Sequence, residues 1–221
     1  MENTAVKVGR DPAGIKLVAV SKTHPAEMLE QAISCGITIF GENKVQEAEP
    51  KILSIGRQRA EWHLIGHLQS NKARRAVELF DVIHTLDSIE LAKRLERICS
   101  ETGRDSLKVL AQIDLAGETT KSGVPEDHLA GLVEFLRGCQ HLKFDGLMLV
   151  PPYFEDPEAV RTYFARLREI RDELVAGEAF AGRRGELSMG MSHDFEIAIE
   201  EGSTIVRVGT AIFGERVSAQ F

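Results

Sequence analysis

The chain has few of the residues that stabilise secreted or membrane proteins. Its 221 residues include three cysteines, Cys35, Cys99 and Cys139, which lie far apart and form no C-x-x-C pair. This number and spacing argue against a disulfide framework and favour a reducing cytoplasm. No apolar run approaches the roughly 18 residues of a membrane span, and residues 1–11 contain no apolar stretch of a secretory signal. We therefore expect a soluble, cytoplasmic, single-domain protein with no membrane partner.

Positive charge is also scarce. The chain has 27 lysines and arginines against 34 aspartates and glutamates, which gives a net charge of -7. This balance argues against nucleic-acid binding through bulk positive charge. The densest basic cluster, "NKARR" at residues 71–75, is expected to form the solvated start of a helix.

Several motifs of nucleotide, metal and nucleophile chemistry are missing. No G-x-G-x-x-G follows the first apolar run, and "GETTKSG" at 117–123 lacks the adjacent Gly-Lys-Ser/Thr of a P-loop. His63 and His67 stand four residues apart, but across a strand end and without H-E-x-x-H, so no metal site is predicted. No serine–histidine pairing is evident along the chain. Nucleotide and metal-assisted hydrolysis therefore rank low.

The chain does contain a regular alternation of strand-like and helix-like segments. Short apolar runs predict eight strands, at 17–20, 37–40, 62–65, 82–85, 109–113, 144–149, 187–189 and 205–208. Helical patterns lie between them, at 25–34, 44–55, 71–79, 88–101, 126–137, 157–174 and 194–200. In the fourth helix, Asp87 followed by Glu90 resembles a capping box. The alternation predicts an α/β fold with a single (β/α)8 TIM barrel over residues 15–221, after a short extension at 1–14, and an open doubly wound sheet is the main alternative.

Polar residues follow the predicted strands where a barrel of this type carries its active site, at the carboxyl ends. Lys22 follows the first strand and shares side-chain parity with Val18 and Val20, so we expect all three to point to one face. The loops after the other strands are similarly polar, as a ligand site requires.

The last two loops favour a phosphate site. Barrels often bind phosphate with the loops after strands seven and eight and a helix start. Ser192 stands just before a predicted helix, and Gly209 and Thr210 follow the last strand. Their hydroxyl and backbone N–H groups are suitable donors to an anion. The alternative is that Ser192 is only a helix N-cap and Gly209 only a turn residue.

Arg207 lies inside the last predicted strand, and barrel closure would place it near Lys22 if it points inward. A neighbouring cation and partial burial both favour the neutral amine, which is the form that attacks a carbonyl to give a Schiff base. The alternatives are a snorkelling side chain for Lys22 and a rim salt bridge for Arg207.

Motifs along nearly the whole chain, from residue 15 to residue 216, carry a resemblance to one family. The chain resembles the pyridoxal phosphate homeostasis protein family, related to the N-terminal barrel of alanine racemase, in "LVAVSKTHP", "FGENKVQEAEPK", "WHLIGHLQSNKARRAVELFDVIHTLDS", "KSG", "GLMLVPP" and "LSMGMSHDFEIAIEEGSTIVRVGTAIFGER". Their order along the chain is the family's order. The resemblance implies an alanine racemase N-terminal-domain-like barrel with pyridoxal 5'-phosphate (PLP) as its cofactor.

The resemblance also implies a role for each matching residue. Lys22 in "AVSK" matches the lysine that forms an internal aldimine with PLP. Ser192, Gly209 and Thr210 match the residues that hold the phosphate. Arg207 matches an arginine that faces the pyridine nitrogen.

Three further wall residues are expected from the same comparison, and three departures stand out. The expected wall residues are Asn43, His67 and Met189. The segment before the first strand is short, so the family's leading helix is expected to be truncated or absent, which affects stability more than chemistry. Asp114 stands where asparagine is expected, and His193 stands where an acidic residue is common.

These roles favour a PLP-binding protein without robust catalysis. An arginine at the pyridine nitrogen discourages protonation there, which makes the cofactor a poorer electron sink. The leading hypothesis is a protein of PLP (vitamin B6) homeostasis that holds PLP as an aldimine on Lys22 and passes it on, with PLP-dependent apoenzymes as candidate recipients. The family implies a monomer. Lys121 is a candidate second amine near the cofactor, with a surface role as the equal alternative.

Two other functions remain open. One is a single-domain PLP-dependent amino-acid racemase, which needs acid/base groups on both faces of the substrate carbon. Tyr153 is the only candidate for a phenolic group of this kind, and a packed loop aromatic is the simpler interpretation. The other is an aldolase-like barrel in which Lys22 forms a Schiff base with the substrate and no PLP is present.

Overall fold

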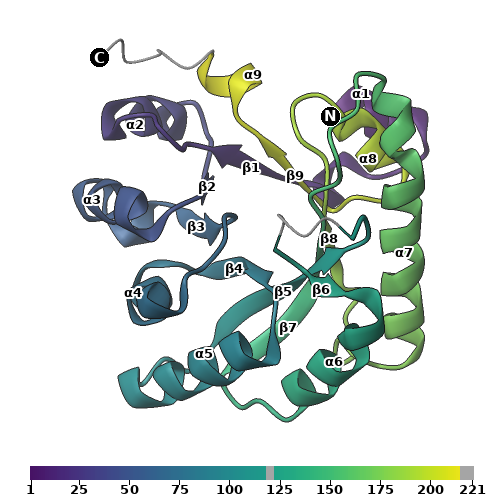
Figure 1. Cartoon of the computed structure of the whole chain (residues 1–221). Coiled ribbons are helices and arrows are strands. Elements are labelled where there is room, and N and C mark those ends of the chain that lie inside the picture. The colour runs from purple at the N-terminus through teal and green to yellow at the C-terminus, as the bar shows by residue number, and fades with distance from the viewer. Residues whose placement is uncertain (118–121, 215–221) are drawn as a thin grey trace.

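Eight parallel strands close into a barrel in the computed structural model, which describes residues 1–117 and 122–214 (Figure 1). The ring consists of β1 (Lys16–Val20), β2 (Ile39–Glu42), β3 (Glu61–Leu64), β4 (Val82–Leu86), β5 (Leu107–Asp114), β7 (Leu142–Met148), β8 (Glu186–Ser188) and β9 (Ile205–Val208). Pairing of β9 with β1 and of β4 with β5 closes the ring. The predicted barrel is therefore confirmed, and the open sheet is excluded.

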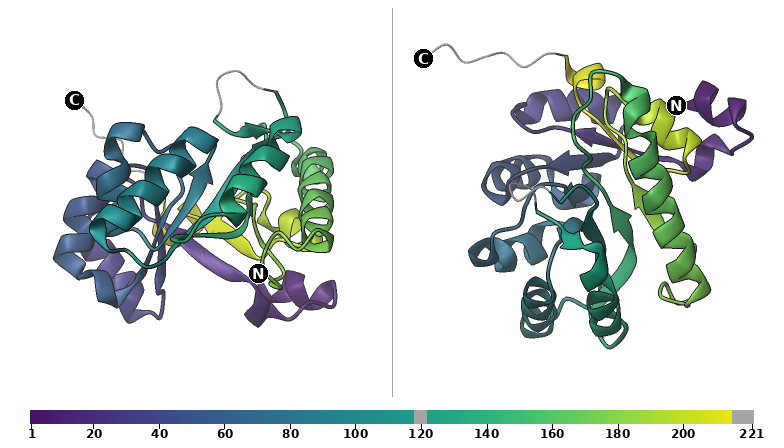
Figure 2. Two further views of the ribbon diagram at one scale, coloured as in Figure 1. Left: turned by 90° about the horizontal axis from the view of Figure 1, so that it is seen from below. Right: turned by 45° about the vertical axis from the view of Figure 1, so that its right-hand side comes forward.

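Helices cover the outer face of the barrel (Figure 1, Figure 2). They are α2 (Ala26–Ser34), α3 (Val45–Ile55), α4 (Ala73–Leu79), α5 (Ile89–Thr102), α6 (Leu129–Arg137), α7 (Arg161–Ala176) and α8 (Phe195–Glu200). Each corresponds to one of the predicted helical patterns. The sequence patterns did not predict α1 (Glu2–Lys7), α9 (Thr210–Phe213) or the two-residue strand β6 (Val124–Pro125), which pairs with β5.

The strands are buried on both faces, as parallel strands usually are. Inside the barrel, Val18, Leu110, Met148 and Ile205 form a small apolar cluster that joins β1, β5, β7 and β9. The larger core lies between the barrel and its helices, where the fully buried rings of Phe40 and Trp62 stack with centroids 5.5 Å apart. The inner layer is thin, which leaves room for polar side chains in the barrel.

The start of α5 corrects one prediction. Asp87 is not the cap of this helix, because the N-cap residue is Ser88, whose hydroxyl accepts a hydrogen bond from the N–H of Leu91 at 3.2 Å. The extended backbone of Ser88 turns its own side chain toward the helix start. The Asp87 carboxylate accepts a hydrogen bond from the Ser88 hydroxyl instead.

The leading helix, expected to be truncated or absent, is present as the six-residue α1. It packs beside α8, where the Thr4 hydroxyl donates to Glu196 at 3.1 Å. Arg10 then ties the segment to the barrel by donating to the carbonyl oxygens of Ile199 at 2.6 Å and Ser203 at 2.7 Å. These contacts join the first fourteen residues to the barrel.

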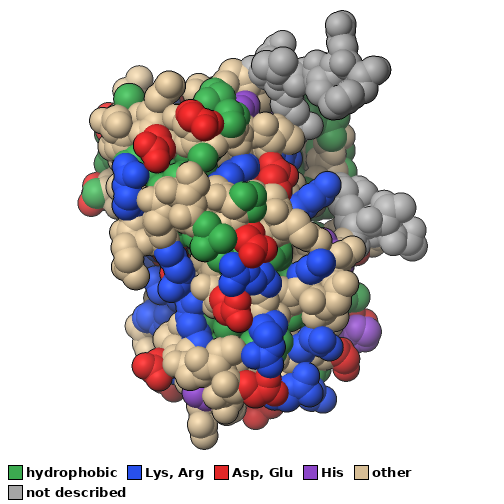
Figure 3. Space-filling model, turned by 90° about the vertical axis from the view of Figure 1, so that its left-hand side faces the viewer, with side chains coloured by type: hydrophobic (Ala, Val, Ile, Leu, Met, Phe, Trp, Pro, Cys, Tyr) green, Lys and Arg blue, Asp and Glu red, His purple; other side chains and the backbone are tan. Residues whose placement is uncertain are grey.

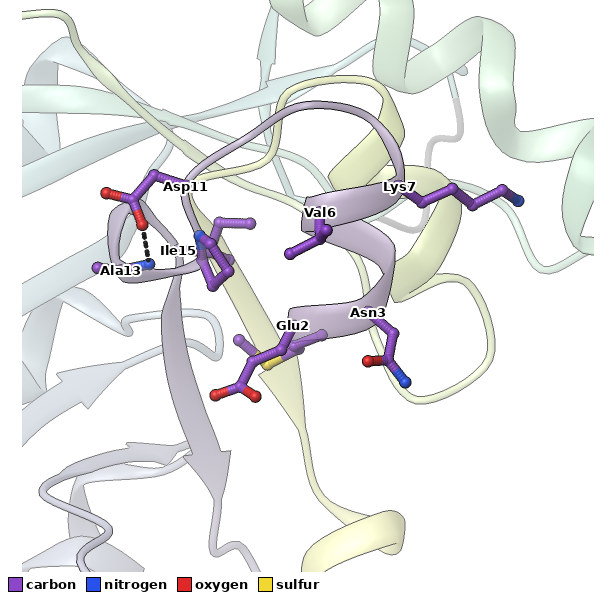
Figure 4. Close-up of a pocket in the computed structure, with 9 residues that line it drawn as sticks. Glu2, Asn3, Val6, Lys7, Asp11, Ala13 and Ile15 are labelled. Atoms are coloured by element: carbon purple, nitrogen blue, oxygen red, sulfur yellow. Dashed lines mark hydrogen bonds between the residues drawn. The ribbon is translucent and has the colours of Figure 1, made fainter.

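A hollow of about 870 Å³ lies beside this N-terminal segment (Figure 4). It is bounded by α1 and by the short 3-10 helix Pro12–Gly14, with Val6 and Asp11 in its wall. None of the residues predicted to bind a ligand lines it.

Charges of both signs are interspersed over the face shown in Figure 3. At the start of α4, the basic cluster predicted at 71–75 is partly neutralised. Arg75 lies 2.8 Å from Glu49 and 2.6 Å from Glu78, and Arg74 pairs with Glu101. Within the described part of the chain, no helix is long and apolar enough to span a bilayer.

Candidate functional site

A cavity of about 360 Å³ lies at the carboxyl ends of the barrel strands. Its volume falls within the roughly 300–1,000 Å³ of small-molecule sites. Its walls come from both ends of the chain and from between: Val20, Lys22, Asn43, Ile65, Met148, Val150, Met191, Ser192, His193, Arg207, Gly209 and Thr210. The cavity therefore brings together six of the eight residues predicted for the site, and leaves out His67 and Met189.

Lys22 follows β1 by two residues, and the residue before it is held by buried charges. The hydroxyl of Ser21 donates to Glu42 Oε1 at 2.7 Å. Lys51 Nζ donates to the same carboxylate oxygen at 2.8 Å and to the Ser21 carbonyl oxygen at 2.9 Å. Burial raises the pKa of Glu42, and the charge of Lys51 and the hydrogen bonds from Lys51 and Ser21 oppose that rise. Ser21 is thus fixed through both its side chain and its backbone.

The residue after Lys22 is held by the same lysine through a second carboxylate. Glu47 Oε1 accepts a hydrogen bond from the backbone N–H of Thr23 and lies 3.1 Å from Lys51 Nζ. Thr23 has a positive φ of 69°, a conformation that costs a β-branched residue energy and needs support from its surroundings. Lys51 therefore braces the chain on both sides of Lys22, and we call Ser21, Thr23, Glu42, Glu47 and Lys51 the Lys22 clamp. The motif "FGENKVQEAEPK" includes Glu42, Glu47 and Lys51, but the sequence analysis assigned no role to any of the three.

Arg207 points into the barrel, an orientation that the sequence analysis left open. It is 3% exposed and pairs in register with Val18 of β1, which places it in the same cavity wall as Lys22. Its guanidinium donates to the carbonyl oxygens of Ser188 at 2.7 Å and Leu149 at 2.8 Å. Burial lowers the pKa of Arg207 to about 10, against an opposing effect of Asp194. The guanidinium is thus held mainly by backbone oxygens, not by a rim salt bridge.

The other end of the cavity carries hydroxyl and backbone donors. Ser192, Gly209 and Thr210 line it, from the loop after β8 and the start of α9. The N-cap residue of α8 is Asp194, whose carboxylate accepts from the N–H of Met191 at 2.6 Å. Ser192 is therefore not the helix cap, and its hydroxyl is available at the cavity wall.

Asn43 reaches the cavity through a close backbone approach. A Cβ added at Gly66, two residues after β3, would lie 2.2 Å from the carbonyl oxygen of Asn43. Only glycine fits there, so the loops after β2 and β3 can touch. Asn43 also lines a neighbouring hollow of about 680 Å³, and His67 lines that hollow rather than the cavity.

Two predicted wall residues therefore lie elsewhere. His67 is exposed on the rim, where its Nδ1 lies 2.9 Å from Ser122 Oγ and 3.3 Å from Asp87 Oδ2. Met189 is fully buried in the core outside the barrel. Because side chains alternate along a strand and Ser188 points inward, Met189 must point outward to the helices. Met191, which was not predicted, lines the cavity instead.

The remaining predicted positions have structural or rim contacts. Asp114 accepts hydrogen bonds from the N–H groups of Ala116 at 3.0 Å and Gly117 at 2.9 Å, which closes a turn after β5. Tyr153 is 78% exposed and stacks on His193 with ring centroids 5.6 Å apart, so it is not a packed aromatic. Lys121 lies outside the described residues. Within 1–117 and 122–214, no three histidine, cysteine, aspartate or glutamate side chains are grouped to hold a metal ion.

The barrel also contains serine–histidine contacts that the sequence did not predict. Ser188 Oγ lies 2.9 Å from His84 Nδ1, and His84 Nε2 lies 2.8 Å from His63 Nδ1. Ser188 and His84 are 104 residues apart, so only closure of the barrel brings them together.

Comparison with known proteins shows which family has this sequence and fold. The model of the alanine racemase N-terminal domain matches residues 3–217. A pyridoxal phosphate homeostasis protein of Aquifex aeolicus (strain VF5) is 42% identical over 216 residues, covering 98% of this chain and 93% of the relative. The structure of PipY of Synechococcus elongatus PCC7942 with PLP bound has a TM-score of 0.84 and 40% identity, covering 96% of this chain and 98% of that one.

A more distant structural neighbour supports the fold alone. Alanine racemase from Corynebacterium glutamicum has a TM-score of 0.69 and 20% identity, and the match covers 99% of this chain but 60% of the racemase. On the family match and on identity above 40% over nearly the full length, this chain belongs to the alanine racemase N-terminal domain family and, within it, to the pyridoxal phosphate homeostasis proteins.

Proposed function

We propose that the chain binds PLP in the cavity at the carboxyl end of its barrel, holds it through Lys22, and serves PLP homeostasis without robust catalysis of its own. One observation carries this proposal. A single cavity contains an amine, a buried guanidinium and a set of hydroxyl and backbone donors, supplied by Lys22, Arg207 and the loops at Ser192 and Thr210. An aldehyde, a pyridine nitrogen and a phosphate are the three groups that such a set complements.

PLP supplies an aldehyde that condenses with a primary amine and releases water, which makes the linkage reversible. The chain's own residues position the amine, the phosphate and the pyridine ring. The Lys22 clamp fixes the backbone from which the amine projects. Ser192, Gly209 and Thr210 offer donors to the phosphate, and the positive charge of Arg207 opposes protonation of the ring nitrogen. These roles favour binding over carbanion chemistry.

Access to the cavity supports a carrier. Ser192 and His193 are exposed at its mouth, so a bound molecule can be reached by water or by another amine. We propose PLP-dependent apoenzymes as recipients and a monomer as the working form. Cys35, Cys99 and Cys139 are free thiols, which favours a reducing compartment, and we propose the cytoplasm.

The test is the near-visible absorbance of the purified protein with added PLP. We expect a band in the wild type and its loss in Lys22→Ala. Lys44→Ala is the matched control, because Lys44 is exposed beside the cavity and makes no capping hydrogen bond with its side chain. Lys44→Ala should keep the band.

Each other outcome contradicts a stated part of the proposal. Without a band in the wild type, PLP binding fails and the aldolase-like barrel becomes the better hypothesis. A band that survives in Lys22→Ala moves the linkage to another amine. Loss of optical rotation from L-alanine that depends on Lys22 would show robust catalysis, although Tyr153, the one phenol considered as a base, does not line the cavity.

A further inference from the structure

A row of buried polar side chains runs from the cavity wall across the inside of the barrel. Arg207 on β9 donates to Ser188 Oγ on β8 at 2.6 Å, and this hydroxyl lies 2.9 Å from His84 on β4. His84 in turn lies 2.8 Å from His63 on β3. None of the four side chains is more than 3% exposed. The contact between β8 and β4 joins strands that are not neighbours in the sheet, so it passes through the interior (Figure 1).

The far end of this row reaches a carboxylate. His63 Nε2 lies 3.2 Å from Glu61 Oε1, at the start of β3. Glu61 also lines a surface hollow of about 410 Å³ together with Arg57 and Lys108. The row therefore connects the carboxyl-end cavity to the opposite end of the barrel.

The chemistry of Arg207 fixes the direction of the row. A guanidinium only donates hydrogen bonds, so Ser188 Oγ accepts from Arg207. The serine hydroxyl has one hydrogen of its own, and a buried hydroxyl needs an acceptor, which His84 Nδ1 supplies. His84 then carries its hydrogen on Nε2 and donates to His63 Nδ1. His63, which accepts at Nδ1, likewise carries its hydrogen on Nε2, the nitrogen that lies 3.2 Å from Glu61 without forming a hydrogen bond.

We propose that His84 and His63 are positioning residues, which orient the Arg207 guanidinium at the cavity through a one-way hydrogen-bonded row that runs from Arg207 to His63. The orientation of Arg207 toward PLP rests on the proposed function. The hydrogen-bonded row from Arg207 to His63 is independent of it. Supporting evidence comes from burial: burial, and with it the charge of Arg207, lowers the pKa of His84 well below its ordinary value, so the ring stays neutral.

Loss of one member of the row leaves a buried polar group without its hydrogen-bonding partner. Buried polar groups stabilise a unique arrangement only when every member has its partner. Removal of the His84 ring leaves Ser188 without an acceptor and frees it to turn away from Arg207. The guanidinium would keep its backbone partners but lose its side-chain support, and its orientation at the cavity would become less defined.

The first measurement uses the protein without PLP. Ring nitrogen and hydrogen NMR shifts at neutral pH should show His84 and His63 both neutral and both protonated on Nε2 alone. A hydrogen on Nδ1 of either ring, or a doubly protonated ring, would overturn the row. This measurement needs only the wild type, so it decides the question even where a variant does not fold.

The second measurement adds PLP to wild type, His84→Leu, His84→Asn and the control His128→Leu. His128 is exposed in the short 3-10 helix Glu126–His128. His84→Leu should bind PLP about tenfold more weakly, as expected for loss of a hydrogen bond to a charged group, and shift the Lys22-dependent absorbance band. His84→Asn, which keeps a short polar group, should restore part of both, and His128→Leu should match the wild type.

The two proposals fail in different ways. A folded His84→Leu with wild-type affinity and an unshifted band would overturn the positioning role. No band in the wild type would contradict PLP binding, and the ring tautomers would still decide the row.

Discussion

Lys22 is fixed by side chains that do not line the cavity. Glu42 is fully buried and Lys51 is 7% exposed, so their ion pair lies in the core between β2 and α3. A buried pair of this kind contributes less to net stability than to a single geometry, but loss of one partner leaves an uncompensated buried charge. A substitution of Glu42 or Lys51, outside the cavity, should therefore disturb the position of Lys22 inside it.

Replacement of Lys51 by methionine tests this dependence. Lys51→Met keeps much of the side-chain volume but leaves the Glu42 carboxylate buried without its cation and frees Ser21 and Thr23 from their brace. We expect the free energy of unfolding at pH 8 to fall by about 3–5 kcal/mol, measured by urea denaturation, and PLP binding to weaken.

The double variant Glu42→Leu/Lys51→Met is the informative control. It removes both charges, so most of the lost stability should return, whereas the effect on PLP binding should remain because the brace is still absent. Lys44→Met, an exposed change at the start of the same helix, should stay within about 0.5 kcal/mol of the wild type. A loss below about 1 kcal/mol in Lys51→Met would contradict the role of the clamp.

Neighbouring elements are joined by one carboxylate on α5. The Glu96 side chain accepts hydrogen bonds from the backbone N–H groups of Gln140, His141 and Leu142, at 2.8 to 3.2 Å, where the chain enters β7. Burial alone would raise the pKa of this carboxyl, but the three N–H donors hold it below its ordinary value. Glu96 thus links α5 to the start of β7.

Glu96→Gln should reduce the free energy of unfolding by about 1–2 kcal/mol at pH 7, because an amide accepts fewer and weaker hydrogen bonds than a carboxylate. A lowered folded-state pKa means that the stabilisation is present above the unfolded-state pKa and is lost as pH falls through the folded-state value. Urea denaturation at pH 7 and at low pH should show the difference between wild type and variant shrinking in acid.

Glu134→Gln provides the comparison for this test, since Glu134 lies on α6 with a side chain 79% exposed. It should change stability by less than about 0.5 kcal/mol at either pH. A difference between wild type and Glu96→Gln that stayed constant with pH would rule out the carboxylate as its source.

Local patterns predicted the barrel because short apolar runs alternate with helical patterns along the chain. The segment 17–20 is apolar throughout and the helix at 88–101 has a clear helical period, and both are present within two residues of the prediction. Strand β6 has only two residues, which is too short for a pattern to show, and α1 lies in the segment whose helix was expected to be truncated or absent. These elements form through tertiary contacts, such as the packing of Ala5 with Ile199.

The candidate site was partly predictable for the same reason. Lys22, Arg207 and Ser192 follow or end strands, so the barrel rule brought them together. Met189 could not be oriented without the register of β8, in which Ser188 takes the inward position. The contact of Ser188 with His84 is between residues with no relation along the chain, and its only cause is closure of the barrel.

The cavity depends on the whole chain because its walls come from residues 20 to 210. Lys22 follows the first strand and Thr210 follows the last, and β1 and β9 are hydrogen-bonded neighbours. A ligand held by both strands stabilises their pairing, and this pairing closes the barrel. PLP binding should therefore raise the free energy of global unfolding, and its effect should not be confined to one loop.

Hydrogen exchange of backbone amides tests this coupling. At PLP concentrations about 100 times the dissociation constant, mass action adds about 2.7 kcal/mol to the free energy of global unfolding. We expect slower exchange in β1 and β9 and also in β4 and β5, on the far side of the ring, in the wild type but not in Lys22→Ala at the same PLP concentration. Slowing confined to amides beside the cavity would mean that the barrel opens locally, with the ligand bound to a part of it. Uniform slowing would show that the first and last strands unfold together with the rest, as expected if their pairing is what closes the fold.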